Sequence, residues 1–276
     1  MDKHHKSIYR KDMRYLYKSI LLLVVILLIF TSYTSIRLQK KVLHLKHAYI
    51  TDKTTHDKPT VSSDKMFVSE ALVQELYQIL KDTTELLDKH GIRYVIDGGT
   101  VLGAVRHGGL IPWDDDADLL VLQEDESKIM GLVEEFFKMG YTIKYTGTMY
   151  VVTYQGTNDT PPFIDIMIIK KNSISNTYEY TNSVLRSTFS KEWYPAEYLF
   201  PRKSYDFGPL KLWGPNNAMW YLDHYYGTRW RTHAPVYNHS NNHISGGLKT
   251  IDVLTEELQK PALPRWPLVD RVDKIR

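Results

Sequence analysis

The pattern of apolar and polar positions divides the chain into segments of different character. Residues 19–36 are mainly apolar and carry no charge, whereas residues 37–66 are polar and show little apolar periodicity. From residue 67 onward, apolar positions recur with the spacings of helices and strands. We therefore expect an N-terminal tail at 1–18, a membrane-spanning signal-anchor at 19–36, a stem at 37–66 and a catalytic domain at 67–276.

The periodicity within the folded part predicts both helices and strands. Helical spacing covers residues 68–90, where Gly91 supplies a C-terminal stop, and shorter helices are expected at 101–106 and 129–139. Strands are expected at 92–96, 118–122, 141–145, 150–154 and 163–169. The mixture predicts an α/β or α+β class, with a mixed sheet flanked by helices.

The apolar run at 19–36 is long enough to cross a thin bilayer. A helix of 18 residues spans about 27 Å, which suits a membrane of the early secretory pathway. Six Lys and Arg residues precede the run within residues 1–18, and four follow it within residues 37–46. This bias favours a cytoplasmic N-terminus, hence a single-pass type II protein with a lumenal domain. A cleaved signal peptide is the alternative, but the basic region is long and no Ala-x-Ala site follows.

Composition excludes some classes of partner and site. Hydrophobic residues make up 43% and charged residues 24%, as in ordinary globular proteins. The net charge of +3 is dispersed, so nucleic acid is not an expected partner. The chain contains no cysteine, which rules out disulfides and cysteine-ligated zinc. Histidines 224, 233, 239 and 243 match no zinc spacing.

The C-terminal third is rich in aromatic residues, which indicates core packing or a groove for a sugar or base.

The densest chemical signal is the acidic run at residues 114–118, which precedes an apolar strand. Alternate residues of a strand face the same side, so Asp116 and Asp118 would project together while Ala117 and Leu119 face the core. Clustered carboxylates repel one another unless a cation binds between them, and Mg²⁺ suits such ligands. A solvated acidic turn is the alternative interpretation.

Two further motifs extend this site. Gly98, Gly99 and Thr100 follow a predicted strand and precede a predicted helix, where glycines allow a phosphate to approach the backbone. Most Gly-Gly pairs are simple turns, which is the alternative. Asp165 interrupts the apolar strand at 163–169, and a charge there is costly unless it is paired or binds metal. A solvent-facing position on an edge strand would also explain it.

The run from Asp97 to Asp118, DGGTVLGAVRHGGLIPWDDDAD, resembles the signature of the LicD family, which includes bacterial phosphocholine transferases, fukutin and fukutin-related protein. Residues 163–166, FIDI, are similar to the family's second acidic strand, and residues 221–227, YLDHYYG, to its C-terminal Tyr-Gly element. The similarity covers roughly residues 70–230. The chain departs from the family in lacking the cysteines that some fukutin-related members use for zinc, and in being short.

The resemblance implies a nucleotidyltransferase fold and transfer of a phosphoalcohol from a CDP-linked donor to a glycan or glycoprotein. For eukaryotic members it adds a membrane anchor and a Golgi or ER location. Inside the signature, Arg106 could neutralise a donor phosphate and His107 could shuttle a proton. A structural hydrogen bond is the alternative role for each.

The predicted mechanism is metal-dependent phosphoryl-type transfer. Asp116, Asp118 and Asp165 would hold Mg²⁺ or Mn²⁺, while Gly98, Gly99 and Thr100 would position the donor phosphate. The alternatives are a sugar-nucleotide glycosyltransferase, which also uses an Asp-x-Asp pair, and an inactive glycan-binding scaffold. Asn238 and Asn158 begin glycosylation sequons, which would suit a lumenal domain.

Overall fold

The computed structural model describes residues 67–157, 160–236, 249–251 and 255–275, all within the compact unit Thr60–Arg276. Among these residues, no helix combines the length and apolar character needed to cross a membrane. The tail, signal-anchor and stem predicted at 1–18, 19–36 and 37–66 lie outside the described residues, as do Asn158 and Asn238.

The first described helix, α2, spans Glu70–Lys89 and agrees closely with the prediction for 68–90. Ser69 caps its N-terminus, because its side chain accepts a hydrogen bond from the Leu72 N–H at 3.2 Å. Gly91 follows the helix with a φ of 64°, a conformation that favours glycine. The predicted apolar positions Leu76, Leu80 and Leu87 are buried, so this face of α2 belongs to the core.

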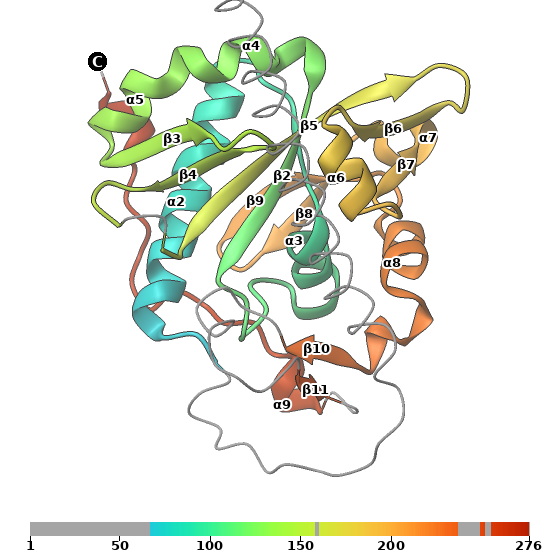
Figure 1. The fold of residues 1–276 in the computed structure, drawn as a ribbon. Coiled ribbons are helices and arrows are strands. Elements are labelled where there is room, and N and C mark those ends of the chain that lie inside the picture. The colour runs from blue at the N-terminus through green and yellow to red at the C-terminus, as the bar shows by residue number, and fades with distance from the viewer. Residues whose placement is uncertain (1–66, 158–159, 237–248, 252–254, 276) are drawn as a thin grey trace, which may run out of the picture. The chain divides into compact units, whose positions relative to one another are not determined.

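Seven strands form one mixed sheet, shown in Figure 1. They are β1 (Tyr94–Ile96), β2 (Asp116–Leu122), β3 (Tyr141–Tyr145), β4 (Tyr150–Tyr154), β5 (Phe163–Asn172), β6 (Thr177–Tyr180) and β7 (Trp193–Pro195). The order is β1-β2-β5-β4-β3, and β6 joins the C-terminal part of β5 and pairs with β7. Strands β2 and β5 are parallel, whereas the other pairs are antiparallel. The predicted mixed sheet flanked by helices is therefore confirmed.

The segment between β1 and β2 differs from its prediction. Helix α3 spans Gly98–Leu102 and continues into a π-helix, η2, at Gly103–His107. The expected helix at 101–106 thus begins three residues earlier, and the Gly-Gly-Thr motif forms its first turn. The cause is Asp97, whose extended backbone (φ −134°, ψ 178°) ends β1 and starts the helix. Gly108, with a φ of 72°, terminates η2.

The segment predicted as one helix at 129–139 consists of several short pieces. A 3₁₀ turn, η3 (Gln123–Asp125), leads into α4 (Glu126–Ile129), a second 3₁₀ turn, η4 (Met130–Leu132), and α5 (Val133–Lys138). Gly131 lies within the second 3₁₀ turn, where its low helix propensity weakens a continuous α-helix.

The C-terminal third, for which periodicity predicted no helix or strand, contains several short elements. Its helices and turns are α6 (Ser183–Thr188), α7 (Ala196–Leu199), α8 (Ala218–Tyr226), η5 (Thr228–Arg231), α9 (Glu256–Gln259) and η6 (Val272–Lys274). Strands β8 (Lys203–Phe207) and β9 (Leu210–Gly214) form one hairpin, and β10 (Ala234–Val236) pairs with β11 (Lys249–Ile251). Many aromatic side chains of this third are buried, as core packing predicts; among them are Tyr194, Phe207, Tyr221 and Trp230.

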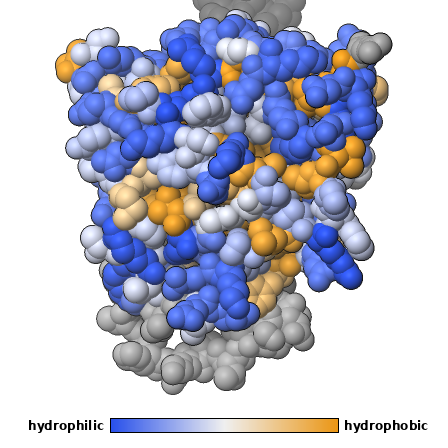
Figure 2. All heavy atoms as spheres, turned by 180° about the vertical axis from the view of Figure 1, so that it is seen from behind, coloured by the Kyte–Doolittle hydropathy of each residue, from blue (hydrophilic) through white to orange (hydrophobic). Residues whose placement is uncertain are grey.

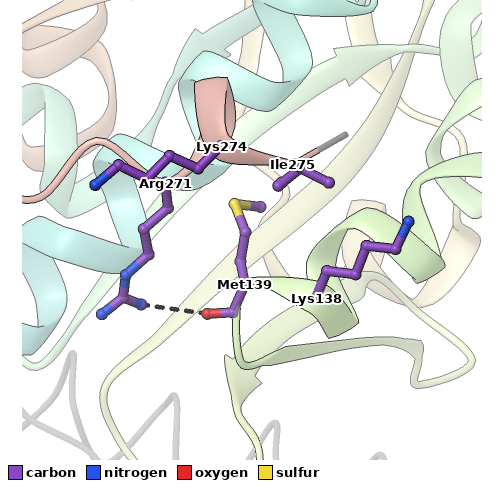
Figure 3. Close-up of a pocket in the computed structure, with 5 residues that line it drawn as sticks. All are labelled: Lys138, Met139, Arg271, Lys274 and Ile275. Atoms are coloured by element: carbon purple, nitrogen blue, oxygen red, sulfur yellow. Dashed lines mark hydrogen bonds between the residues drawn. The ribbon is translucent and has the colours of Figure 1, made fainter.

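The surface seen from behind is mostly hydrophilic, with hydrophobic patches across its middle (Figure 2). A shallow pocket lies where α5 meets the C-terminal segment. It is lined by Lys138, Met139, Arg271, Lys274 and Ile275, and Arg271 donates a hydrogen bond to the Met139 carbonyl at 3.3 Å (Figure 3). The lining of this pocket does not include Asp116, Asp118 or Asp165.

Candidate active site

The parallel pairing of β2 and β5 brings the predicted acidic residues together. Asp118 is the register partner of Asp165, and Asp116 lies two residues before Asp118 on the same face of β2. One carboxylate oxygen from each of Asp116, Asp118 and Asp165 lies within 4.8 Å of the others. All three residues are half-buried, whereas Ala117 and Leu119 are buried in the core. The alternation expected for this strand is therefore confirmed, and Asp165 does not lie on an edge strand.

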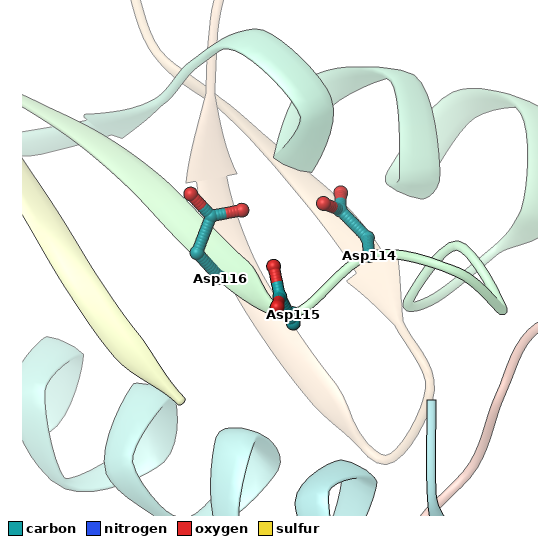
Figure 4. Close-up of side chains that lie close together, drawn as sticks. All are labelled: Asp114, Asp115 and Asp116. Atoms are coloured by element: carbon teal, nitrogen blue, oxygen red, sulfur yellow. The ribbon is translucent and has the colours of Figure 1, made fainter. Parts of the chain in front are cut away.

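The acidic cluster extends to the loop before β2. Asp114, Asp115 and Asp116 also place one carboxylate oxygen each within 4.8 Å of one another. Figure 4 shows these three side chains where the loop enters β2. Asp115 is fully buried, while Asp114 and Asp116 are half-buried. Desolvation by burial, followed by the charge of Asp116, raises the pKa of Asp114 well above its usual value.

The electrostatics of Asp118 reflect the same crowding. Desolvation is the largest cause that raises its pKa well above the usual value, and the charges of Asp116 and Asp165 come next. Each charged carboxylate therefore makes ionisation of the others more costly. A divalent cation among these oxygens would remove that cost, and carboxylates are ligands that Mg²⁺ and Mn²⁺ prefer. The donor set on β2 and β5 thus fits such an ion.

The glycines of α3 pack directly against the acidic cluster. A Cβ added to Gly98 would lie 2.7 Å from Asp118 Oδ2, and one added to Gly99 would lie 2.8 Å from Asp114 Oδ2. Gly98 also has a φ of 50°. A side chain at either position would displace a carboxylate, so both residues let the helix approach the acidic groups.

The polar groups of the Gly-Gly-Thr motif have partners within the protein. The Gly98 N–H donates to the Tyr221 hydroxyl at 3.2 Å. The Thr100 hydroxyl accepts from the Asp118 N–H at 2.8 Å, and Thr100 is buried. The predicted role of Gly98, Gly99 and Thr100 in binding a donor phosphate stays a prediction, and the Thr100 hydroxyl already holds β2.

Arg106 and His107 lie in the last turn of η2. Arg106 Nη1 donates to the Trp230 carbonyl at 2.7 Å and to the His233 carbonyl at 3.4 Å. Burial lowers its pKa to about 10, while nearby Asp114 raises it, so the guanidinium stays charged at neutral pH. These contacts give Arg106 the structural role that was its alternative, with its charge still near the acidic cluster.

His107 is a buried, neutral imidazole. Its ring packs edge-on against Trp113 at a centroid distance of 5.9 Å, and its Nδ1 accepts from Arg106 Nε at 3.3 Å. Burial is the main cause that lowers its pKa to about 4, with the charge of Arg106 second. A group with that pKa is unprotonated at neutral pH, so acting as a general acid would be unfavourable for it.

Asp97 is a buried carboxylate that sequence reasoning did not assign to the site. It is 1% exposed and follows β1, adjacent to the motif at Gly98. The Tyr194 hydroxyl donates to its Oδ1 at 2.7 Å and the Tyr180 hydroxyl to its Oδ2 at 3.1 Å. Its position within the run from Asp97 to Asp118 was the available signal, but the two tyrosines are distant in sequence.

The C-terminal Tyr-Gly element also lies beside the acidic cluster. Tyr221 on α8 contacts Gly98 through its hydroxyl. Burial, then the charges of Glu192 and Asp118, raise the pKa of the Tyr226 hydroxyl well above its usual value. Residues far apart in the sequence therefore enclose one acidic site.

His224 on α8 is half-buried and belongs to an aromatic cluster instead. Its ring stacks on Trp220 at 4.7 Å and contacts Trp193 edge-on at 4.7 Å. Burial lowers its pKa. His239 and His243 lie outside the described residues.

Comparison with known proteins agrees with this arrangement. The family model described as "LicD/FKTN/FKRP, nucleotidyltransferase domain" matches residues 91–217, which include both acidic strands and α3. A Rickettsia prowazekii protein, "Uncharacterized protein RP689", is 36% identical over 204 residues, covering 72% of this chain and 73% of that protein.

Two relatives with described activities match shorter stretches. The "Lipopolysaccharide cholinephosphotransferase LicD" of Haemophilus influenzae is 32% identical over 98 residues, covering 30% of this chain and 37% of that protein. Human "Ribitol 5-phosphate transferase FKRP" is 35% identical over 69 residues, covering 25% of this chain and 14% of that protein.

A mixed sheet flanked by helices, matched by a nucleotidyltransferase-domain model, defines the class of the protein. The chain belongs to the LicD family, as the run from Asp97 to Asp118 predicted. Membership of that family makes it a transferase.

Proposed function

We propose that this chain transfers a phosphoalcohol group, of the phosphocholine or ribitol-phosphate type, from a CDP-linked donor to a glycan or glycoprotein. The observation that carries the proposal is the convergence of Asp116, Asp118 and Asp165 from two parallel strands. The named relatives, a cholinephosphotransferase and a ribitol 5-phosphate transferase, support the choice of transferred group.

In this proposal Asp116, Asp118 and Asp165 hold Mg²⁺ or Mn²⁺. Bound there, the ion supplies charge neutralisation at the donor diphosphate. The three carboxylates fix its place because they extend from the paired strands β2 and β5 rather than from a mobile loop. The half-buried position of these side chains leaves them open to a ligand on one side.

The remaining site residues leave room for the donor and favour binding of its negative charge. Gly98 and Gly99 keep the approach to the carboxylates free of side chains. Arg106 adds a permanent positive charge near Asp114, which favours binding of a diphosphate. His107, neutral and packed on Trp113, shapes the wall of η2 rather than moving a proton.

The reaction is a displacement at the donor's distal phosphorus. An acceptor hydroxyl oxygen forms a bond to the phosphorus that carries the alcohol. The bond from that phosphorus to the bridging oxygen breaks, and CMP leaves with the electron pair. The hydroxyl proton passes to solvent. Such a reaction depends mainly on positioning and electrostatic stabilisation. The paired strands β2 and β5 would supply the positioning, and a cation held by the three carboxylates would supply the stabilisation.

The proposal includes a cellular setting. The apolar run at 19–36 would anchor the chain as a single-pass type II membrane protein, with its catalytic domain in the lumen of the Golgi or ER. Asn238 would then be accessible to glycosylation.

The test is nucleotide release by the purified full-length chain. CDP-choline and CDP-ribitol are each incubated with Mg²⁺ or Mn²⁺ and a mixture of glycan acceptors, beside UDP-sugars under the same conditions. The proposal predicts CMP release that depends on metal and acceptor. UDP release without CMP release would instead support a sugar-nucleotide glycosyltransferase, and release of neither would support a glycan-binding scaffold.

A further inference from the structure

The carboxylate of Asp97 is held by hydroxyl groups from two different strands. Tyr194 on β7 donates to Oδ1 at 2.7 Å. The Tyr180 hydroxyl on β6 lies between two carboxylates, 3.1 Å from Asp97 Oδ2 and in contact with Glu192, and its one proton is shared between them. Asp97 is 1% exposed, Tyr180 1% and Tyr194 2%. A buried carboxylate is costly unless hydrogen bonds compensate it, so both hydroxyls have a specific task.

Tyr194 also links Asp97 to the next residue, Gly98, through a second tyrosine. The Tyr194 ring stacks on Tyr221 at a centroid distance of 4.6 Å and an interplanar angle of 15°. The Tyr221 hydroxyl in turn accepts from the Gly98 N–H at 3.2 Å. The turn between β1 and α3 is thus fixed on both sides, through the side chain of Asp97 and the backbone of Gly98.

The same turn holds Asp118 by three contacts. The Asp97 N–H donates to the Asp118 carbonyl at 3.0 Å, and the Asp118 N–H donates to the Thr100 hydroxyl at 2.8 Å. The Cα of Gly98 faces the Asp118 carboxylate so closely that a Cβ would lie 2.7 Å from Oδ2. A shift of the turn would therefore shift Asp118 relative to Asp165.

We propose that Asp97, Tyr180 and Tyr194 are positioning residues that set the geometry of the metal-binding carboxylates Asp116, Asp118 and Asp165. The inference rests on the proposed function, because it assigns these residues to the same site. Phenylalanine at 194 would keep the ring and its packing but lose the contact with Asp97. Phenylalanine at 180 would lose the contacts with both Asp97 and Glu192, so Tyr194→Phe is the cleaner of the two variants. In each of the two tyrosines the positioning role belongs to the hydroxyl, which can be removed without opening a cavity.

A matched control exists elsewhere in the core. The Tyr141 hydroxyl donates to Asp82 Oδ2 at 2.5 Å, and both residues are 0% exposed. That pair joins β3 to α2, away from the acidic cluster. Tyr141→Phe therefore removes a buried hydroxyl–carboxylate bond, together with the hydrogen bond that Arg271 donates to the same hydroxyl at 2.7 Å, without touching the turn at Asp97.

The experiment measures Mn²⁺ binding to the full-length chain by electron paramagnetic resonance, together with the melting temperature. We expect Tyr194→Phe and Tyr180→Phe to raise the Kd for Mn²⁺ by about tenfold, as loss of partners that orient metal ligands does. Tyr141→Phe should lower the melting temperature while leaving that Kd unchanged. Asp97→Asn should weaken Mn²⁺ binding as well.

The outcomes separate this inference from the proposed function. Folded Tyr194→Phe and Tyr180→Phe proteins with the wild-type Kd would overturn the positioning role while leaving the metal site intact. An equal loss of affinity in Tyr141→Phe would overturn it too, because a general loss of stability would then explain the result. Wild-type protein that binds no Mn²⁺ would overturn the proposed function and this inference together.

Discussion

Gly98 and Gly99 bring the start of α3 into contact with two carboxylates, and this contact gives the motif a more specific role than a turn. The Cβ positions built on these residues fall 2.7 Å from Asp118 and 2.8 Å from Asp114. From sequence, the glycines indicated close approach of a phosphate. The structure shows that they also allow close approach of the protein's own acidic groups.

Gly98→Ala should impair the site beyond the cost of backbone strain. Alanine at a φ of 50° is strained, and its Cβ would displace the Asp118 carboxylate. We expect a loss of roughly 1–3 kcal/mol in the free energy of unfolding, with a large fall in Mn²⁺ affinity. Gly108→Ala is the control, since Gly108 has a φ of 72° but nothing within 4 Å of its added Cβ. If both variants bind Mn²⁺ equally, the contact with Asp118 is unimportant.

His107 makes stability depend on pH in the mildly acidic range. Its pKa of about 4 in the folded protein lies below the unfolded value of about 6.5, so the unfolded state binds the proton more readily. The resulting stability is complete above about pH 6.5 and is lost as pH falls toward 4. We expect His107→Gln to remove on the order of 2 kcal/mol of this pH-dependent change. Denaturant unfolding at several pH values measures it, and parallel profiles for both proteins would contradict the assignment.

At the scale of elements, two glutamine side chains of α2 form hydrogen bonds with the backbone of the C-terminal segment at residues 266–269. Gln78 Nε2 donates to the Val269 carbonyl at 2.8 Å, and the Val269 N–H donates to Gln78 Oε1 at 2.8 Å. Gln74 pairs with Trp266 in the same manner, at 3.2 and 2.8 Å. One turn of α2 thereby replaces the backbone partners that a strand would provide.

Removing the buried Gln78 should destabilise the domain more than removing the half-buried Gln74. Gln78 is 5% exposed and also donates to Asp82, so Gln78→Ala leaves buried polar groups without a partner. We expect a loss of about 2–3 kcal/mol for Gln78→Ala and less than about 1 kcal/mol for Gln74→Ala. Thermal and denaturant unfolding of both variants would measure this, and equal losses would show that burial of the pair is unimportant.

Local periodicity predicted five of the seven strands of the sheet, β1 to β5, and missed β6 and β7. Strands β3 and β4 have the expected bounds, and α2 differs by two residues at its start and one at its end. Alternation along β2 placed Asp116 and Asp118 on one face because side chains in a strand alternate strictly. The convergence of Asp165 with Asp118 depends on the parallel pairing of β2 with β5. The family resemblance indicated a second acidic strand at residues 163–166, but neither it nor the periodicity gave the pairing.

The parts that escaped prediction depend on contacts between distant segments. Asp97 meets Tyr180 and Tyr194, which lie 83 and 97 residues further along the chain. The dense aromatic residues after Tyr194 gave no clear helical or strand period, so α8 and the β8–β9 hairpin were missed. Arg106 was expected at a phosphate, but its carbonyl partners near Trp230 could not be read from the signature.

At the scale of the whole molecule, the described fold belongs to a unit that begins at Thr60. The first buried residue of the apolar core is Val73 on α2. The predicted signal-anchor at 19–36 lies outside the unit that begins at Thr60. Catalytic machinery and predicted anchor are therefore separable in sequence.

A chain truncated near residue 60 should fold and remain soluble. The cut removes the apolar run at 19–36 and most of the predicted stem while retaining α2, the sheet and the C-terminal segment. Gel filtration and circular dichroism, compared with the full-length chain in detergent, would test this. An insoluble truncated chain beside a well-behaved full-length protein would show that the boundary is misplaced.

In the proposed reaction, the carboxylates of Asp116, Asp118 and Asp165 on β2 and β5 hold the metal on which release of CMP depends. The most direct measurement is metal-dependent CMP release by Asp165→Asn, beside Asp206→Asn as a control on the exposed strand β8. We expect Asp165→Asn to stay folded, because asparagine is nearly isosteric, but to lose turnover by about 10²–10³-fold. Asp206→Asn should match wild type. A folded Asp165→Asn protein with wild-type turnover would show that Asp165 does not hold a metal needed for the reaction.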